Sequence, residues 1–198
     1  IVPLSTLRLC ELMVEVGIPA GVVNVVPGYG HDAGARIAAH PGIDKVSFTG
    51  STRVGRSIVE ASAGNLKRVH LELGGKGANV VFADADLAAA VNGSAFAIFH
   101  NQGQACIAGS RLVLHEAIAD EFLDRFLALA RSLRVGDPLA PGTEMGPLTS
   151  PEHRDRVLSY VKVAQDEGGE VLAGGTAPDD PALARGCYVL PTVVRADP

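Results

Sequence analysis

Two short segments of this 198-residue chain each place one reactive side chain among glycines. The first reads LELGGK at residues 71–76, where Glu72 is a candidate general base. The second reads NQGQAC at residues 101–106, where Cys106 is a candidate nucleophile. A thiol can form a covalent adduct and a carboxylate can activate water. Together the two side chains therefore indicate acyl chemistry.

Both residues also have a structural interpretation. A cysteine is most often buried as a small apolar side chain, and Cys106 would be reactive only if a helix start or local N–H groups favoured its thiolate. Glu72 interrupts a strand suited to burial, so it either points to solvent or lines a cleft where it can act as a base. For the other cysteines, Cys10 and Cys187, the structural interpretation is favoured.

A third segment could approach a phosphate group. Residues 50–57 read GSTRVGRS between a predicted strand and a predicted helix, where glycines and free N–H groups favour an anion. The pattern is close to the phosphate-binding loop GxxxxGK[ST], but Arg56 replaces the lysine. Phosphate contact and a plain tight turn are equally supported. Residues 28–34 read GxGxxxG, one residue longer than the dinucleotide fingerprint, which favours a structural turn.

Alternating strands and helices must position these segments. Apolar runs predict strands over residues 22–26, 45–48, 68–73, 79–82 and 111–115. Helical patterns predict helices from Ser5 to Gly17 and over 32–39, 51–63, 86–99, 117–133 and 151–165, with Asp84 and Ser150 as candidate N-caps. An apolar, strand-like run follows at 187–194. This alternation predicts an α/β fold of parallel βαβ units, with the loops after residues 26, 48 and 73 at one sheet edge.

The composition excludes several classes of function. The net charge is −5 and no run of basic residues appears, so nucleic-acid binding is not expected. The longest apolar runs are too short to span a bilayer, so no membrane partner is expected. The three cysteines form no disulfide framework, which favours a reducing, cytoplasmic compartment. The six histidines are scattered without ligand spacing, so no metal site is expected.

Taken together, the segments resemble the aldehyde dehydrogenase superfamily. FTGSTRVG at residues 48–55 resembles its cofactor loop, and LELGGK at 71–76 resembles its glutamate signature. QGQACIAGS at 102–110 resembles its cysteine signature, while GDP at 136–138 and MGPL at 145–148 fit its downstream pattern. The motifs cover essentially the whole chain in the expected order. Several of them together are specific, whereas each alone is modest.

This resemblance implies an oxidoreductase that converts an aldehyde to a carboxylic acid with NAD, or alternatively NADP. Cys106 would attack the aldehyde carbon to give a thiohemiacetal, and hydride transfer to the nicotinamide would leave a thioester. Glu72 would activate the water that hydrolyses this thioester, which favours hydrolysis over transfer to coenzyme A. The backbone N–H of Cys106 would form half of an oxyanion hole.

The resemblance also implies cofactor-binding positions and a domain plan. The matching cofactor positions are Gly30, Gly34, Thr49, Gly50, Ser51, Val54 and Leu73. Residues 1–74 would be the C-terminal part of a Rossmann-like cofactor-binding domain. Residues 75–198 would be the N-terminal part of an α/β catalytic domain that carries the nucleophile. The expected partner is a small-molecule aldehyde, and the full-length protein is expected to be a homodimer or homotetramer.

Some family residues have no counterpart in residues 1–198. These are an upstream Asn for the oxyanion, an upstream Lys and Glu for the adenosine ribose, and a downstream Glu for the nicotinamide ribose. The chain also begins at Ile1 without methionine. We therefore expect a central fragment of a longer enzyme, inactive by itself. Two other functions stay open from the residues: a phosphate-loop nucleotide-binding module, and a catalytically silent relative in which Cys106 only packs.

Overall fold

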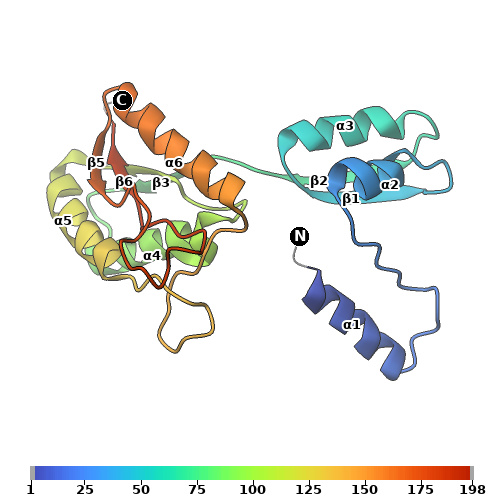
Figure 1. The fold of residues 1–198 in the computed structure, drawn as a ribbon. Helices are drawn as coiled ribbons and strands as arrows, with labels where there is room; N and C mark the ends of the chain where they lie inside the picture. The colour runs from blue at the N-terminus through green and yellow to red at the C-terminus, as the bar shows by residue number, and fades with distance from the viewer. Residues whose placement is uncertain (1–2, 197–198) are drawn as a thin grey trace. The chain divides into compact units, whose positions relative to one another are not determined.

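The computed structural model describes residues 3–196. The chain divides into two compact units, Ile1–Gly74 and Gly75–Pro198, so the division falls between the two glycines of the LELGGK segment. Figure 1 shows helices and strands in both units, which agrees with the predicted α/β class.

The first unit is built around two parallel strands. β1 (Lys45–Gly50) and β2 (Arg68–Leu73) pair in register from Lys45 opposite Arg68 to Gly50 opposite Leu73. The helix α3 (Thr52–Ser62) connects them, which makes a βαβ unit. The same unit holds α1 (Leu4–Glu15), the single-turn π-helix η1 (Gly30–Gly34) and α2 (Ala35–Ala39), and α2 contacts α3.

Apolar alternation explains how α3 covers this pair of strands. Exposure alternates along both strands, so Leu71 and Leu73 share one face. A Cβ atom added at Gly55 of α3 would lie 2.9 Å from Cδ2 of Leu73, which is closer than packed carbon atoms approach. Glycine at this position therefore lets α3 rest against the end of β2, and Gly55 and Ile58 are the buried residues of α3.

The predicted strand over residues 22–26 is wrong. This segment has no regular secondary structure, and Val22, Val23 and Val26 are 67%, 44% and 66% exposed. Its β-branched composition favours extended backbone, but a strand also needs a neighbour that accepts its hydrogen bonds. Within residues 3–196 no strand pairs with it.

Two predicted helix starts also differ from the structure. α1 begins at Leu4 with Pro3 at the N-cap position and no side-chain cap, so Ser5 lies inside the helix. α4 (Leu87–Phe99) is capped by Asp86, whose Oδ1 accepts the Ala89 N–H at 3.0 Å, and not by Asp84. A turn in which the Ala85 N–H donates to the Phe82 carbonyl holds Asp84 outside the helix.

The second unit contains two small sheets. β3 (Ala78–Val81) and β4 (Arg111–Leu114) are parallel, and α4 followed by the 3₁₀ turn η2 (His100–Gly103) joins them. α5 (Glu116–Ser132) and α6 (Pro151–Asp166) follow. β5 (Glu170–Ala173), which the sequence did not predict, pairs antiparallel with β6 (Val193–Arg195). Of the strand-like run at 187–194, only its end is therefore paired.

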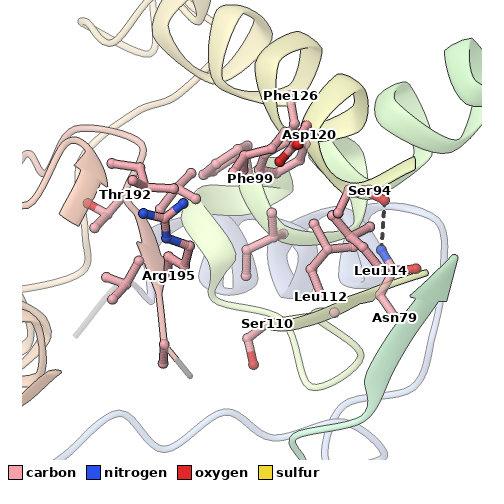
Figure 2. A pocket seen from close by; sticks show the side chains of 18 residues that line it. Asn79, Ser94, Phe99, Ser110, Leu112, Leu114, Asp120, Phe126, Thr192 and Arg195 are labelled. Atoms are coloured by element: carbon pink, nitrogen blue, oxygen red, sulfur yellow. Dashed lines mark hydrogen bonds between the residues drawn. The ribbon is translucent and has the colours of Figure 1, made fainter. Parts of the chain in front are cut away.

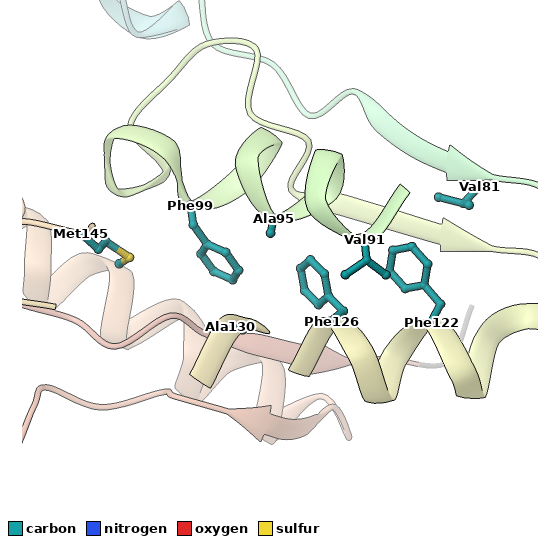
Figure 3. Packing of buried hydrophobic residues seen from close by; sticks show 8 residues of the cluster. All are labelled: Val81, Val91, Ala95, Phe99, Phe122, Phe126, Ala130 and Met145. Atoms are coloured by element: carbon teal, nitrogen blue, oxygen red, sulfur yellow. The ribbon is translucent and has the colours of Figure 1, made fainter. Parts of the chain in front are cut away.

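The core of the second unit lies between α4 and α5, with Val81 of β3 and Met145 completing it (Figure 3). Phe122 is fully buried, and the ring of Phe126 stacks on those of Phe122 and Phe99 with centroids 5.9 Å apart in both pairs. Phe99 is the last residue of α4. The core therefore fixes the point where the chain enters the segment that carries Cys106.

Within residues 3–196, no helix combines the length and apolarity needed to cross a membrane. The same residues contain no cluster of three or more His, Cys, Asp or Glu side chains that could hold a metal ion.

Candidate active site

The carboxyl ends of β1 and β2 bring several candidate residues side by side. The strand register places Thr49 opposite Glu72 and Gly50 opposite Leu73. In parallel α/β sheets this is the edge at which ligands bind. The structure therefore places the GSTRVG segment and Glu72 within one unit, although the helix and loop of residues 51–67 separate the two strands in sequence.

The start of α3 is arranged to receive an anion. Ser51 is its N-cap, and its Oγ accepts the Val54 N–H at 3.3 Å. The first turn carries no acidic residue that would compete for its N–H groups, so the positive end of the helix dipole stays available. A side chain at Gly50 would collide with the Phe48 ring, so a larger residue where β1 turns into the helix would force that ring to move.

Glu72 lies on the strand face that α3 does not cover, and its side chain is 62% exposed. Its Oε1 is 3.5 Å from Nε2 of His70, whose Nδ1 is 3.3 Å from the hydroxyl of Ser47. These side chains and Thr49 make a polar row along one face of the two strands. Glu72 therefore points to solvent within this unit, where water can reach it.

Gly30 and Gly34 lie elsewhere in the first unit, at the two ends of η1. A Cβ atom at either position would meet nothing within 4 Å, so packing within the unit does not require glycine there. Because residues 22–26 form no strand, this turn does not follow a strand as the GxGxxxG pattern predicted. It leads into α2, which contacts α3.

Cys106 lies on the loop between η2 and β4, and its side chain is exposed. All three cysteines are free, and Cys10 and Cys187 are partly buried. Backbone bonds shape the loop on both sides of the cysteine: among them, the Ala108 N–H donates to Ala105 O at 3.2 Å, and the Gly109 N–H donates to Ala97 O at 3.1 Å. Among the described residues, no acceptor receives the N–H of Cys106 itself. The cysteine is thus exposed, and its N–H is unpaired within residues 3–196.

A cavity of about 540 Å³ lies beside the cysteine loop, lined by Gln102, Gly103 and Gln104 together with residues of α6 and of 189–192. Lys76 and Arg156 are its cationic lining residues, His153 lies beside them, and no lining residue is acidic. Burial lowers the pKa of His153, and the positive charge of Arg156 lowers it further. The sequence analysis missed this set, although the i, i+3 spacing of His153 and Arg156 on a predicted helix was visible.

A second cavity, of about 330 Å³, shares Phe99 with the first as a lining residue (Figure 2). Apolar side chains of α4, α5 and β4 line it together with Leu172 and residues 192–196. The Asn79 amide donates to Ser94 Oγ at 2.8 Å. Gly109 and Ser110 also line it, so it reaches the end of the cysteine loop but not Cys106.

Comparison with known proteins identifies the family to which the chain belongs. The model of the aldehyde dehydrogenase family matches residues 1–197. The chain belongs to the aldehyde dehydrogenase family. This confirms the resemblance found in the sequence. The chain is 50% identical over 192 residues to the mitochondrial aldehyde dehydrogenase of Sus scrofa. The aligned region covers 96% of this chain and 36% of that protein.

Solved structures agree with this family and with the α/β fold. PnpE from Pseudomonas sp. WBC-3 is similar with a TM-score of 0.98 and 70% identity, over 100% of this chain and 40% of PnpE. A structure of PnpE in complex with nicotinamide adenine dinucleotide gives a TM-score of 0.97 at 70% identity, over 99% of this chain and 40% of that one. The aldehyde dehydrogenase chain described here thus spans 36% to 40% of the length of these relatives.

Proposed function

We propose that the protein containing this chain oxidises an aldehyde to a carboxylic acid with NAD, through a thioester on Cys106. The observation that carries the proposal is the cysteine loop of an aldehyde dehydrogenase chain: Cys106 is exposed, and its own backbone N–H has no acceptor among residues 3–196. An exposed thiol with a free donor beside it suits nucleophilic attack on a carbonyl.

Cys106 performs the covalent steps. Its thiolate Sγ attacks the aldehyde carbon, a C–S bond forms, and the carbonyl oxygen becomes an oxyanion that accepts the free Cys106 N–H. When bound, NAD⁺ supplies the acceptor for the hydride that leaves this carbon. Loss of hydride oxidises the adduct to a thioester on Cys106.

Glu72 completes turnover in this proposal. Its carboxylate takes a proton from water, the resulting hydroxide attacks the thioester carbon, and the C–S bond breaks to release the acid and the Cys106 thiolate. Exposure of Glu72 at the sheet edge supports this role, because a base for hydrolysis must reach solvent water.

We assign cofactor-binding roles to the residues at the start of α3 and at the carboxyl edge of the sheet. Gly50, Ser51 and Val54 form the entry to α3, whose N–H groups and lack of acidic neighbours fit a pyrophosphate. Thr49 and the carbonyl of Leu73 lie at the same sheet edge. Gly30 and Gly34 are assigned through the resemblance only. Ile1–Gly74 would thus belong to the cofactor-binding domain, and Gly75–Pro198 to the catalytic domain.

Other expectations remain proposals about the full-length protein. A homodimer or homotetramer is measurable by sedimentation. A cytoplasmic location fits three free cysteines. NAD is favoured over NADP because the similar PnpE structure holds NAD.

The test is replacement of Cys106 by Ser in the full-length protein. We expect aldehyde-dependent NADH formation to fall at least about 10³-fold, because the thioester route is lost. Cys187→Ser is the matched control and should retain activity. Mass spectrometry should find an acyl adduct on the peptide with Cys106 in the unmodified protein. Retained activity of Cys106→Ser, or an adduct on another residue, would refute the nucleophile assignment.

A further inference from the structure

Three successive residues ahead of Cys106 hold a left-handed backbone. The φ angles are +50° at Asn101, +56° at Gln102 and +68° at Gly103. Only glycine adopts this region without steric cost, so Asn101 and Gln102 must be held there by their surroundings. The chain therefore leaves the end of α4 by a sharp turn that other contacts have to maintain.

The amide of Gln102 supplies one such contact. Its hydrogen-bond partners assign its orientation: the oxygen accepts the Gly146 N–H at 3.0 Å, and the nitrogen donates to the Asn101 carbonyl at 3.1 Å. Gly146 is buried, and a Cβ atom there would lie 3.3 Å from the Gln102 amide. The glycine at 146 thus leaves room for this side chain.

Gln104 supplies a second contact to the same segment. Its Oε1 accepts the Thr149 N–H at 3.3 Å, and its backbone carbonyl accepts a bond from the Asn101 amide at 3.3 Å. Two glutamines therefore connect the cysteine segment to residues 146–149, which lead directly into α6. Both glutamines are partly buried, although the two bonds of Gln104 lie at the surface.

We propose that Gln102 and Gln104 are positioning residues that fix the Cys106 loop on residues 146–149. This inference rests on the proposed function, because it concerns the same thiol. The bond from Gly109 to Ala97 holds the far end of the loop, and the glutamines hold the near end, two residues before Cys106. An exposed side chain is placed mainly by its backbone. Because a shift of about 1 Å in a reacting group can cost about 10²-fold in rate, this attachment governs turnover.

The experiment compares two replacements of Gln104 in the full-length protein. Gln104→Met keeps the length of the side chain but has no oxygen to accept the Thr149 N–H, whereas Gln104→Glu keeps an acceptor oxygen. Gln102→Met removes both bonds of that amide. Gln165→Met, on the exposed surface of α6, is the control. Steady-state kinetics with NAD⁺ and propanal and hydrogen exchange of residues 104–110 are measured for each.

We expect Gln104→Met to lower kcat by about 10-fold or more with little change in KM, and to speed exchange in the loop. Gln104→Glu should restore kcat and the exchange rate of the loop. Gln102→Met should show the largest loss of kcat and the fastest exchange, and Gln165→Met should match the unmodified protein. Equal losses in Gln104→Met and Gln104→Glu, or unchanged exchange in both Met variants, would overturn the proposal. If the unmodified protein oxidises no aldehyde, the proposed function fails, while hydrogen exchange still decides whether the glutamines hold the loop.

Discussion

At the scale of single residues, Cys106 and Glu72 have different local settings. Cys106 is exposed on a loop that hydrogen bonds attach at both ends. Glu72 is exposed on a strand face, with Nε2 of His70 3.5 Å from its carboxylate. A polar contact this exposed contributes little to stability. Glu72 is therefore available for chemistry without much cost to the fold, which a mutation can test.

Glu72→Gln in the full-length protein should separate the two half-reactions. The amide keeps the shape of the side chain but cannot take a proton from water, so the thioester should form and then hydrolyse slowly. We expect steady-state turnover to fall about 10²- to 10⁴-fold, with an initial burst of NADH retained. Glu60→Gln, on the exposed face of α3, is the control. Unchanged steady-state turnover would count against the role of base.

At the scale of elements, the packing of α3 against β2 decides the shape of the cofactor edge. Gly55→Ala would bring a methyl group within 2.9 Å of Leu73, so the helix or the leucine must shift. We expect a loss of stability of about 1–3 kcal/mol and weaker NAD⁺ binding, measured by thermal unfolding with and without NAD⁺. Gly64→Ala is the control, because nothing lies within 4 Å of its added Cβ. Equal unfolding temperatures of the two variants, with and without NAD⁺, would contradict this packing of α3 against Leu73.

In the same unit, a buried lysine binds the backbone carbonyls at the C-terminal end of α2. Lys67 is only 6% exposed, and its Nζ donates to the Ala38 carbonyl at 2.6 Å and the His40 carbonyl at 2.8 Å. Cations favour the C-terminal end of a helix dipole, and these bonds satisfy carbonyls that the helix leaves free.

Lys67→Met should therefore loosen α2 without removing apolar packing. The variant keeps a long apolar side chain but leaves the Ala38 carbonyl unpaired, at a cost of about 1–3 kcal/mol. The His40 carbonyl loses one bond and keeps the one from the Ile43 N–H. We expect faster hydrogen exchange over residues 35–43, whereas the exposed Lys45→Met should leave it unchanged. Exchange in Lys67→Met that equals the unmodified rate would show that water replaces the ammonium group.

At the scale of the whole molecule, residues 1–198 should not sustain catalysis by themselves. The chain spans 36% to 40% of the relatives reported above. The oxyanion Asn and the ribose-binding residues that the resemblance implies have no counterpart in it. We expect no steady NAD⁺ reduction by the isolated segment with aldehydes that the full-length protein oxidises, once circular dichroism shows helix and strand content. Continuous NADH formation by the segment would refute this.

The sequence alone determined the family, the α/β class and most elements. Its motifs are local patterns, and segments with a local signal were predicted well: Ser150 caps α6, for example, through its bond to the His153 N–H at 3.2 Å. Residues 22–26 were mispredicted because β-branched composition favours extended backbone but does not supply a partner strand.

Only the tertiary structure decided which distant residues meet. The parallel register sets Glu72 beside Thr49, and the turn after α4 brings Gln102 and Gln104 onto residues 146–149. The strand and helix pattern predicted that the ends of the first pair share a sheet edge but not their register. The second pairing has no signal in the sequence, because its hydrogen bonds join segments more than 20 residues apart. Residue types thus determined the chemistry that the chain can offer, while backbone pairing and packing determined where its thiol and its carboxylate are held.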